Sequence, residues 1–280
     1  MRETIEFRIA ERDARLHLEP GLGVSLGGSI RKVVLPMGDA RVQRIAQLNH
    51  AYGKRGDAFF MSWNLRRSYT ERELRSAELL NWVVRAHFEP TGSMCGTVYD
   101  ASSECPHCGA GARQVSELLL DTRRIPKGKD IAQTLSGEMV VSSRFASAFL
   151  EQGLRGAEFH PVLHHGRGAL QASDWRQLVV TSKPLVLSPR TVAGNNPFDL
   201  DEAGAFRCPL GHVAGLNQIS ELYVEKADRD DADLWVTDTL FGDRRGELRP
   251  EPRLLISPRL RDVLWAMDAK GYALEAAHFV

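Results

Sequence analysis

Apolar and polar residues follow strand-like and helix-like periods along the chain, and this pattern predicts short strands mixed with helices. In the first third, alternation predicts strands at 4–9 and 30–35, and apolar residues at helical spacing predict a short helix at 39–52. Residues 20–28 read PGLGVSLGG between the two strands. A phosphate-binding loop needs a buried strand directly before it and a helix directly after it, and neither is expected here. We therefore predict a turn or surface loop.

A longer helix is expected near residue 70. Thr70 is a good N-cap residue, and Glu73 three positions later completes a capping box. Apolar residues then recur at helical spacing as far as His87, before Pro90 opens a turn sequence. The pattern predicts a helix from Thr70 to His87.

From about residue 93, the chain resembles two diverged copies of one unit. Residues 110–121 and 214–225 are identical at six of twelve positions. Further matches, in the same order, are residues 141–145 with 256–260 and Gly156 with Gly271. Because the matches keep their order along the chain, we interpret them as an internal duplication.

Each copy predicts the same series of elements. In the first copy we expect strands at 114–120, 139–141 and 157–162, and a helix that begins after Ser142. In the second copy we expect strands at 218–224, 254–256 and 272–280, and a helix that begins after Ser257 with Pro258 at its first position. Such units favour an α+β fold with two pseudo-twofold halves. The expected division is an N-terminal α+β extension at 1–92, a first unit at 93–170 and a second at 171–280.

Composition narrows the class of protein. Apolar residues make up 43% of the chain and charged residues 26%, as in globular proteins. Lys plus Arg and Asp plus Glu number 36 each, so the balance disfavours broad nucleic-acid binding, which needs clustered basic charge. No run approaches the roughly 18 apolar residues of a membrane helix, and the first 20 residues do not resemble a secretory signal. We expect a cytoplasmic protein that does not span a membrane.

The candidate chemistry lies in two cysteine-bearing turns, called here the knuckles. The first knuckle, residues 105–109, reads CPHCG, and the second, residues 208–212, reads CPLGH. Two thiolates with two residues between them can hold one metal ion, and a C-x3-H spacing also keeps two zinc-type ligands. Because a closed tetrahedral site needs four ligands, we predict one structural Zn²⁺ held by both knuckles. Its predicted ligands are Cys105, Cys108, Cys208 and His212.

Two alternatives remain open at this point. Cys95 lies ten residues before Cys105, so a rival zinc site would use Cys95, Cys105 and Cys108 with His107 or a distant fourth ligand. In the other alternative the knuckles bind no metal and form tight turns with buried thiols.

Other chemistry-bearing residues have ordinary structural explanations. The chain contains no G-x-S-x-G, H-E-x-x-H or Walker motif. The acidic run at 228–233 lacks the glycine and final glutamate of an EF-hand loop, so we predict a solvated turn. Glu117 and Glu221 are expected at equivalent strand positions, which favours a structural role. His164 and His165 are expected in a solvent-exposed linker.

Three arginines, Arg244, Arg245 and Arg249, form a basic hairpin-like segment. Such a segment can bind RNA or an acidic protein, although most basic patches are solvated surface. It supports an alternative function as a zinc-ribbon-type nucleic-acid-binding protein.

The knuckles and the segments after them resemble the double-CxxCG proteins of bacteria. The residues that carry the resemblance are 105–109, 141–145 and 156–159, with second copies at Cys208 and Ile256. It covers roughly residues 93 to 280. The sequence departs from the pattern at Gly211-His212, where a second C-x-x-C-G is expected. The resemblance implies an immunity protein that neutralises a cognate toxin.

These observations lead to three hypotheses about function. The first is a non-enzymatic zinc-binding protein that occludes a protein partner, as an immunity protein occludes its toxin. The second is the nucleic-acid-binding protein described above. The third is an enzyme with an atypical site near His164, His165 or the turn at 228–233.

Overall fold

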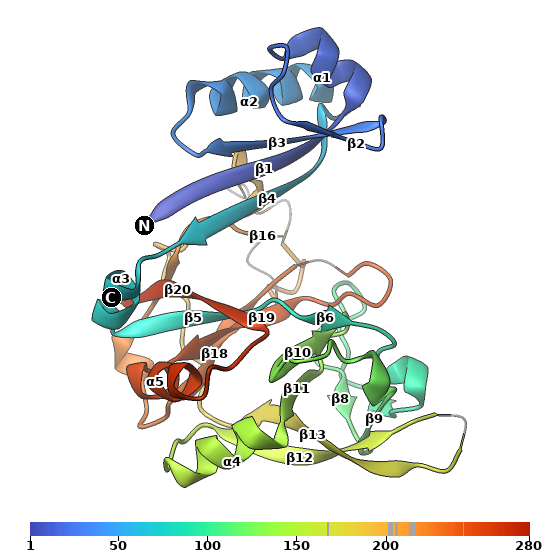
Figure 1. The fold of residues 1–280 in the computed structure, drawn as a ribbon, viewed down its shortest axis with the longest axis vertical. Helices are drawn as coiled ribbons and strands as arrows, with labels where there is room; N and C mark the ends of the chain where they lie inside the picture. Colours follow the sequence, from blue (N-terminus) through green and yellow to red (C-terminus); the bar gives the residue numbers. More distant parts are fainter. Residues whose placement is uncertain (167, 201–203, 205–206, 213–216, 243) are drawn as a thin grey trace. The chain divides into compact units, whose positions relative to one another are not determined.

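The computed structural model describes residues 1–166, 168–200, 204, 207–212, 217–242 and 244–280, and the chain divides into two units, residues 1–73 and 74–280 (Figure 1). The predicted α+β class is confirmed, because both units contain helices and β-sheet. Within the described residues, no helix is both long and apolar enough to cross a membrane.

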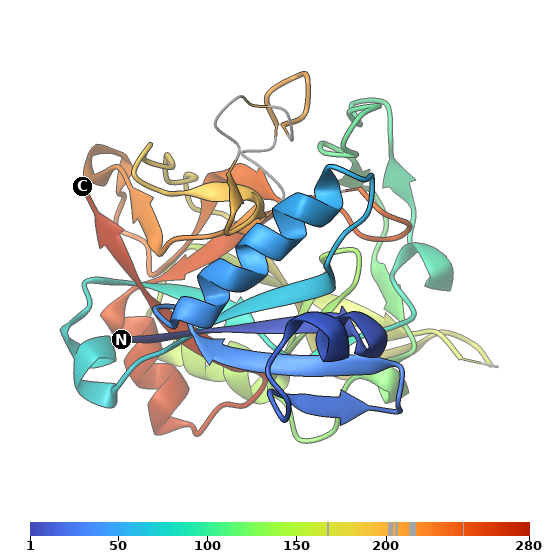
Figure 2. The same ribbon diagram turned by 90° about the horizontal axis from the view of Figure 1, so that it is seen from above.

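The first unit is an antiparallel sheet with two helices on one face (Figures 1 and 2). Its strands are β1 (Arg2–Ala10), β2 (Val24–Leu26), β3 (Ile30–Pro36) and β4 (Phe60–Ser68), in the order β2-β3-β1-β4. Its helices are α1 (Glu11–His17) and α2 (Ala40–Gly53). This β-α-β-β-α-β series buries alternate residues of β1, such as Ile5 and Phe7, in the core.

The predictions for residues 1–60 are largely confirmed. Strands occupy 4–9 and 30–35, and α2 begins after Asp39, whose carboxylate accepts a hydrogen bond from the Arg41 amide at 2.9 Å. Asp39 therefore acts as the N-cap. The glycine-rich segment is exposed, as expected of a surface loop, and contains the short strand β2.

The predicted helix from Thr70 to His87 is wrong beyond its first turns. The capping box is present, since the Thr70 amide donates to Glu73 at 2.7 Å and the Glu73 amide donates to the Thr70 hydroxyl at 3.2 Å. However, α3 (Glu71–Ser76) ends early, and β5 (Leu79–Val84) follows. The side chains of β5 are buried on both faces. A strand buried in this way reads as a continuous apolar run, which cannot be distinguished from a buried helix by period alone.

Residues 74–280 form two larger sheets. One has the order β17-β20-β5-β19-β18 and the other the order β6-β10-β11-β13-β12-β9. Besides β5, the first sheet contains β17 (Leu222–Val224), β18 (Leu234–Phe241), β19 (Glu251–Ile256) and β20 (Tyr272–Phe279). The second contains β6 (His87–Phe88), β9 (Leu118–Leu120), β10 (Ile131–Thr134), β11 (Met139–Ser142), β12 (Ala157–His164) and β13 (Gln171–Val180).

Both large sheets follow one plan of pairing. Strand β9 runs parallel to β12, as β17 does to β20, and β10 and β18 pair antiparallel with β11 and β19. Helices α4 (Ser143–Glu151) and α5 (Pro258–Ala266) follow β11 and β19. Each sheet has one further strand in its middle. In one sheet it is β13, which follows all the other strands of that sheet in the sequence. In the other sheet it is β5, which precedes all the other strands of that sheet. The duplication and its pseudo-twofold relation stay an interpretation of the sequence, with which this plan agrees.

The predicted domain boundaries at residues 92 and 170 each separate strands that pair with one another in the structure. Strand β5, before residue 92, pairs with β19 and β20. Strand β13, after residue 170, pairs with β11 and β12.

Residues 141–144 of the first copy, which read V-S-S-R and are called here the V-S-x-R motif, form a hydrogen-bonded network around the buried Asp130. Ser142 caps α4 through the Phe145 amide and donates its hydroxyl hydrogen to Asp130 at 2.9 Å. Arg144 donates to Asp130 and to the backbone oxygen of Met267, at the end of α5. The second copy repeats these contacts with Ser257, Asp233, Arg259 and the backbone oxygen of Gln152. The motif therefore fixes each helix to a buried charge and to the end of the other helix.

The two predicted strands 114–120 and 218–224 are each interrupted. Within them lie β8 (Arg113–Gln114) and β9, and β16 (Asn217–Gln218) and β17. The interruption falls at Ser116 and Ser220, whose hydroxyls accept hydrogen bonds from the amides of Val98 and Val192. Side-chain bonds of this type compete with the strand ladder.

The remaining short elements of residues 74–280 are strands and 3-10 turns. Strand β7 (Tyr99–Asp100) pairs with β8, and β14 (Ala193–Asn196) pairs with β15 (Asp199–Leu200) and β16. The 3-10 turns are η1 (Ser93–Cys95), η2 (Thr122–Arg124) and η3 (Lys226–Asp228).

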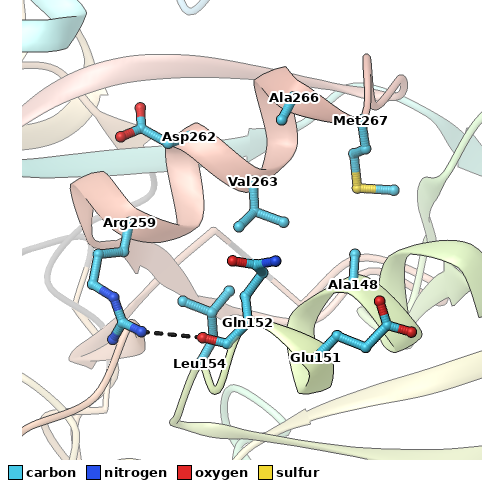
Figure 3. A pocket seen from close by; sticks show the side chains of 9 residues that line it. All are labelled: Ala148, Glu151, Gln152, Leu154, Arg259, Asp262, Val263, Ala266 and Met267. Carbon is cyan, nitrogen blue, oxygen red and sulfur yellow. Dashed lines mark hydrogen bonds between the residues drawn. The ribbon is translucent and has the colours of Figure 1, made fainter.

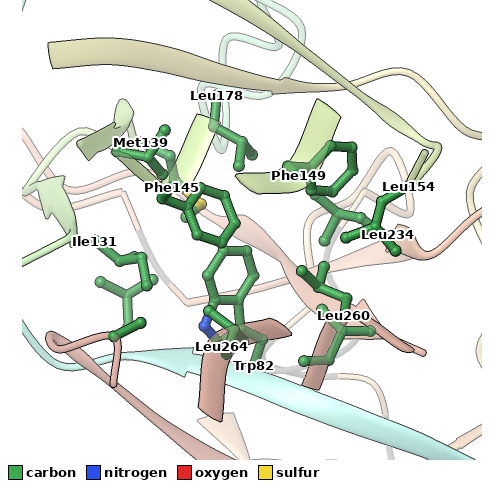
Figure 4. Packing of buried hydrophobic residues seen from close by; sticks show 14 of the residues in the cluster. Trp82, Ile131, Met139, Phe145, Phe149, Leu154, Leu178, Leu234, Leu260 and Leu264 are labelled. Carbon is green, nitrogen blue, oxygen red and sulfur yellow. The ribbon is translucent and has the colours of Figure 1, made fainter. Parts of the chain in front are cut away.

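The main core of this unit lies between α4, α5 and the two large sheets (Figure 4). Phe145 packs against Trp82 of β5 with ring centroids 5.7 Å apart, and both side chains are almost fully buried. Phe145 and Phe149 form the buried face of α4, and Leu260 and Leu264 form that of α5. Each of these large side chains contributes about 1.5–3 kcal/mol through burial.

Candidate metal centre

Each knuckle is a tight turn closed by its own backbone. In the first, the Cys105 amide donates to the Ala110 oxygen at 2.7 Å and the Gly109 amide donates to the Cys105 oxygen at 2.9 Å. In the second, the Gly211 amide donates to the Cys208 oxygen at 2.8 Å. Gly109 and Gly211 have φ angles of +75° and +78°. Glycine adopts this conformation without steric cost, which explains its place in both sequences.

The fold brings the two knuckles together. The Sγ atoms of Cys105 and Cys208 lie 3.6 Å apart, although about a hundred residues separate them. His212 directs Nδ1 to Cys108 Sγ at 3.6 Å and to Cys208 Sγ at 3.9 Å. All four ligand atoms lie within 4.8 Å of one another, and the three thiols are buried. The four predicted ligand residues therefore form one cluster that can hold a metal ion.

The spacing of the four atoms fits a tetrahedral ion. With metal–sulfur bonds of about 2.3 Å and metal–nitrogen bonds of about 2.0–2.1 Å, tetrahedral angles place two sulfurs about 3.8 Å apart and sulfur and nitrogen about 3.6 Å apart. The observed separations of 3.6 Å between Cys105 and Cys208, 3.6 Å between Cys108 and His212, and 3.9 Å between Cys208 and His212 are close to these values. The other three separations are within 4.8 Å, so these atoms must draw closer together for all four to bind one ion.

The environment of the thiols differs between the two cysteines of the first knuckle. The backbone N–H groups of Cys108 and His107 donate toward Cys105 and lower the pKa of its thiol to about 6. Burial raises the pKa of the Cys108 thiol to about 11. Metal ligation requires thiolates, so a metal ion that binds here must displace a tightly held proton from Cys108.

Neither Cys95 nor His107 belongs to this cluster. Cys95 is buried at the end of η1, and burial raises the pKa of its thiol. His107 is exposed on the first knuckle. The part of the chain that the structure describes thus assembles the ligand set drawn from both knuckles, without the rival ligand Cys95.

The predicted basic segment lies beside the first knuckle. Arg244 approaches Glu104, the residue before Cys105, at 3.2 Å. Arg249 lies against Gly109, where a Cβ atom would be 2.9 Å from Arg249 Cδ. Its guanidinium donates to the backbone oxygens of Gly246 and Leu248. Three thiolates and a divalent ion carry a net charge of −1, so nearby arginines are electrostatically favourable. Two of the three arginines therefore have structural partners.

Other sequence-based expectations have mixed outcomes. The acidic run is not a simple solvated turn, because Asp233 is buried in the Arg259 network and Asp230 accepts a hydrogen bond from Trp235 at 2.6 Å. Glu117 and Glu221 lie at equivalent positions, but between strands instead of within them. Glu117 is exposed, whereas Glu221 contacts His278 at 2.9 Å.

His164 is not in an exposed linker, because it is the last residue of β12. Its Nδ1 accepts a hydrogen bond from the Thr122 amide at 3.2 Å. His165 is exposed, as predicted.

The fold also gathers a group of glutamates near β10 that no sequence motif indicates. Glu138 accepts hydrogen bonds from Tyr99 and the Gly92 amide, and Glu251 accepts one from Gln133. Burial raises the pKa of Glu138 and raises that of Glu251 to about 7. Glu247 lies near them and accepts a hydrogen bond from Ser93. No local motif connects these positions, because only the fold brings them together.

A pocket of about 530 Å³ lies between α4 and α5 (Figure 3). Arg259 reaches across it to the backbone oxygen of Gln152 at 3.2 Å. Its lining residues are Ala148, Glu151, Gln152, Leu154, Arg259, Asp262, Val263, Ala266 and Met267. The charged groups at its edges include Arg259, which is already bound to Asp233.

Comparisons with known proteins add no assignment. No protein-family model matches the chain, and no curated protein matches it.

Proposed function

We propose that the cluster is a structural zinc site with Cys105, Cys108, Cys208 and His212 as its four ligands. The observation that carries the proposal is the convergence of three buried thiols and one imidazole nitrogen, whose ligand atoms all lie within 4.8 Å of one another. Three thiolates with one imidazole are a ligand set that suits Zn²⁺. Four protein ligands leave no open position for a substrate or a reactive water.

The ion would join segments that are distant in the sequence. The first knuckle leads into β8 and β9, and the second precedes β16 and β17. Metal binding to such a preformed set contributes directly to the free energy of folding. Zn²⁺ would thus act here as a cross-link between the two knuckles.

We further propose that the zinc-linked scaffold is a non-enzymatic protein that binds a protein partner, as an immunity protein binds its toxin. The closed ligand set supports a structural over a catalytic role for the ion. The resemblance of the two knuckles and their V-S-x-R segments to double-CxxCG proteins supports the immunity-type partner.

The metal proposal is tested by the zinc content of protein purified under reducing conditions without added metal. We expect one zinc ion per chain by plasma mass spectrometry, and a loss of zinc from Cys208→Ser and His212→Ala. Cys95→Ser is the matched control, since it removes a buried thiol outside the cluster. A Cys208→Ser protein that keeps stoichiometric zinc would refute the site.

The partner proposal needs a separate experiment. The protein should be co-expressed with any toxin encoded beside its gene, and cell survival and co-purification should be measured. Rescue from lethality together with a stable complex supports the proposal. Lethality that is unchanged by the zinc-loaded protein would contradict it.

A further inference from the structure

The three thiols of the cluster are not equivalent in their neighbours. Cys105 Sγ has Cys208 Sγ at 3.6 Å, whereas Cys108 Sγ has the imidazole Nδ1 of His212 at the same distance. A disulfide bond is about 2.05 Å long, so the first pair must close by roughly 1.5 Å. Both cysteines lie on turns, where small torsional changes can move a sulfur by this amount.

We propose that Cys105 and Cys208 form a disulfide bond when the metal site is oxidised, so that a covalent link between the knuckles replaces the ion. The proposal rests on the zinc site described above. It assigns a redox modification to one pair of the three clustered thiols and leaves Cys108 outside the disulfide bond.

The reaction balances with a peroxide as the oxidant. One thiolate attacks an oxygen of hydrogen peroxide, which gives a sulfenic acid and hydroxide. The second thiolate attacks the sulfenic sulfur and displaces another hydroxide, and the two hydroxides take up two protons to become water. The two sulfurs lose two electrons in total, which the peroxide gains. Loss of two thiolate ligands releases the ion, since the two remaining ligands cannot close a tetrahedral site.

The link between the knuckles would keep the fold that the ion maintained. It joins residues 105 and 208, and a loop of this length gives a large entropic stabilisation in the chain-entropy model. A bond between Cys105 and Cys108 would instead close a very short loop and leave the two knuckles unconnected. The two products therefore differ in stability as well as in connectivity.

Digestion with trypsin distinguishes these two disulfide products directly. No lysine or arginine lies between Arg85 and Arg113 or between Arg207 and Lys226. A disulfide between Cys105 and Cys108 stays within the single peptide 86–113. A disulfide to Cys208 joins peptide 86–113 to peptide 208–226.

The experiment treats zinc-loaded protein with hydrogen peroxide and follows zinc release with a chromogenic chelator. Unreduced tryptic peptides are then analysed by mass spectrometry. We expect one zinc ion released for each cross-linked peptide pair, and persistence of the pair in Cys108→Ser and Cys95→Ser. The pair should be absent from Cys105→Ser and Cys208→Ser. Oxidation confined to peptide 86–113, or to sulfinic and sulfonic acids, would overturn the proposal.

A metal-free arm separates this proposal from the zinc site itself. The wild-type protein is reduced, stripped with a chelator and then oxidised with the same peroxide. If the purified protein contains no zinc, the proposed metal site fails, yet this arm still tests the disulfide. If zinc is present and stripped protein does not form the cross-linked pair, the disulfide proposal fails while the metal site stands.

Discussion

Arg144 donates hydrogen bonds of 2.8 Å to both carboxylate oxygens of Asp130, which is 6% exposed. Asp130 also accepts from the Lys270 amide at 3.0 Å, so its charge is bound from α4 and from the turn before β20. Asp233 has the corresponding partners in Arg259 and the Arg155 amide. The sequence repeat V-S-x-R is therefore explained by the need to satisfy two buried carboxylates.

Substitution of Arg259 by Ala should lower the free energy of unfolding by about 2–3 kcal/mol, because it leaves the charge of Asp233 buried without its counter-ion. Urea denaturation measures the change. Arg155→Ala is the matched control, since Arg155 pairs with Asp231, whose side chain is 91% exposed, and its loss should cost under about 1 kcal/mol. Equal effects of the two substitutions would show that the Asp233 network does not stabilise the fold.

Gly271 is expected to tolerate no side chain. Its φ is +109°, and an added Cβ atom would overlap the backbone oxygen of Ile131 in β10. Gly271→Ala should therefore destabilise the protein by at least about 3 kcal/mol. Gly128 also has a positive φ, of +69°, but a Cβ atom there would lie in open space, so Gly128→Ala should cost only about 1 kcal/mol. Thermal unfolding of both variants distinguishes backbone conformation from close approach.

Removal of the metal should loosen the knuckles before the rest of the chain. We expect a strong chelator to lower the melting temperature by roughly 10 °C, because metal binding contributes to folding. Amide hydrogen exchange should accelerate at Cys105, Gly109 and Gly211, whose N–H groups form the hydrogen bonds of the turns. Strand β1, in the first unit, is the internal control and should keep its protection. Unchanged exchange in both knuckles would contradict the cross-linking role.

Glu251 should make stability fall as pH rises. Burial raises its pKa from 4.5 to about 7 in the folded protein, so the folded state binds the proton more tightly than the unfolded chain. Its favourable contribution is complete below about pH 4.5 and is lost as pH rises to about 7. Glu251→Gln, which is neutral throughout, should remove a change on the order of 2 kcal/mol across this window.

Urea denaturation between pH 4.5 and 8 measures this effect of Glu251. Glu117→Gln is the control, because Glu117 is exposed. A pH profile of Glu251→Gln that matches the wild type would rule out the buried carboxyl as its source.

The four residues of the cluster could be predicted from sequence because their spacing within each knuckle is local. C-x2-C and C-x3-H each fit within one turn, and the similarity of the segments that follow the two turns indicated that the turns belong together. The caps Ser142 and Ser257 were predictable for the same reason, since an N-cap bonds an amide three residues later. A pattern confined to one turn of the chain can be interpreted without knowledge of the rest of the fold.

Features that depend on distant neighbours could not be predicted. Residues 79–84 form a strand only because β19 and β20 lie on its two sides. The environment of Glu251 depends on Gln133, more than a hundred residues away. Ser116 interrupts a strand by accepting a hydrogen bond from the amide of Val98, 18 residues earlier in the chain. In each case tertiary contacts override the local pattern.

The insertion of β5 and β13 into sheets made by other segments has a consequence for dissecting the protein. A cut after residue 170 would leave β13 on one fragment and its neighbours β11 and β12 on the other, while β5 would be parted from β19 and β20. Each fragment would then lack the central strand of its own sheet and present two unpaired edges. Neither fragment should fold stably alone, but mixing the two fragments should restore both sheets, as the two halves of a split reporter protein reassemble.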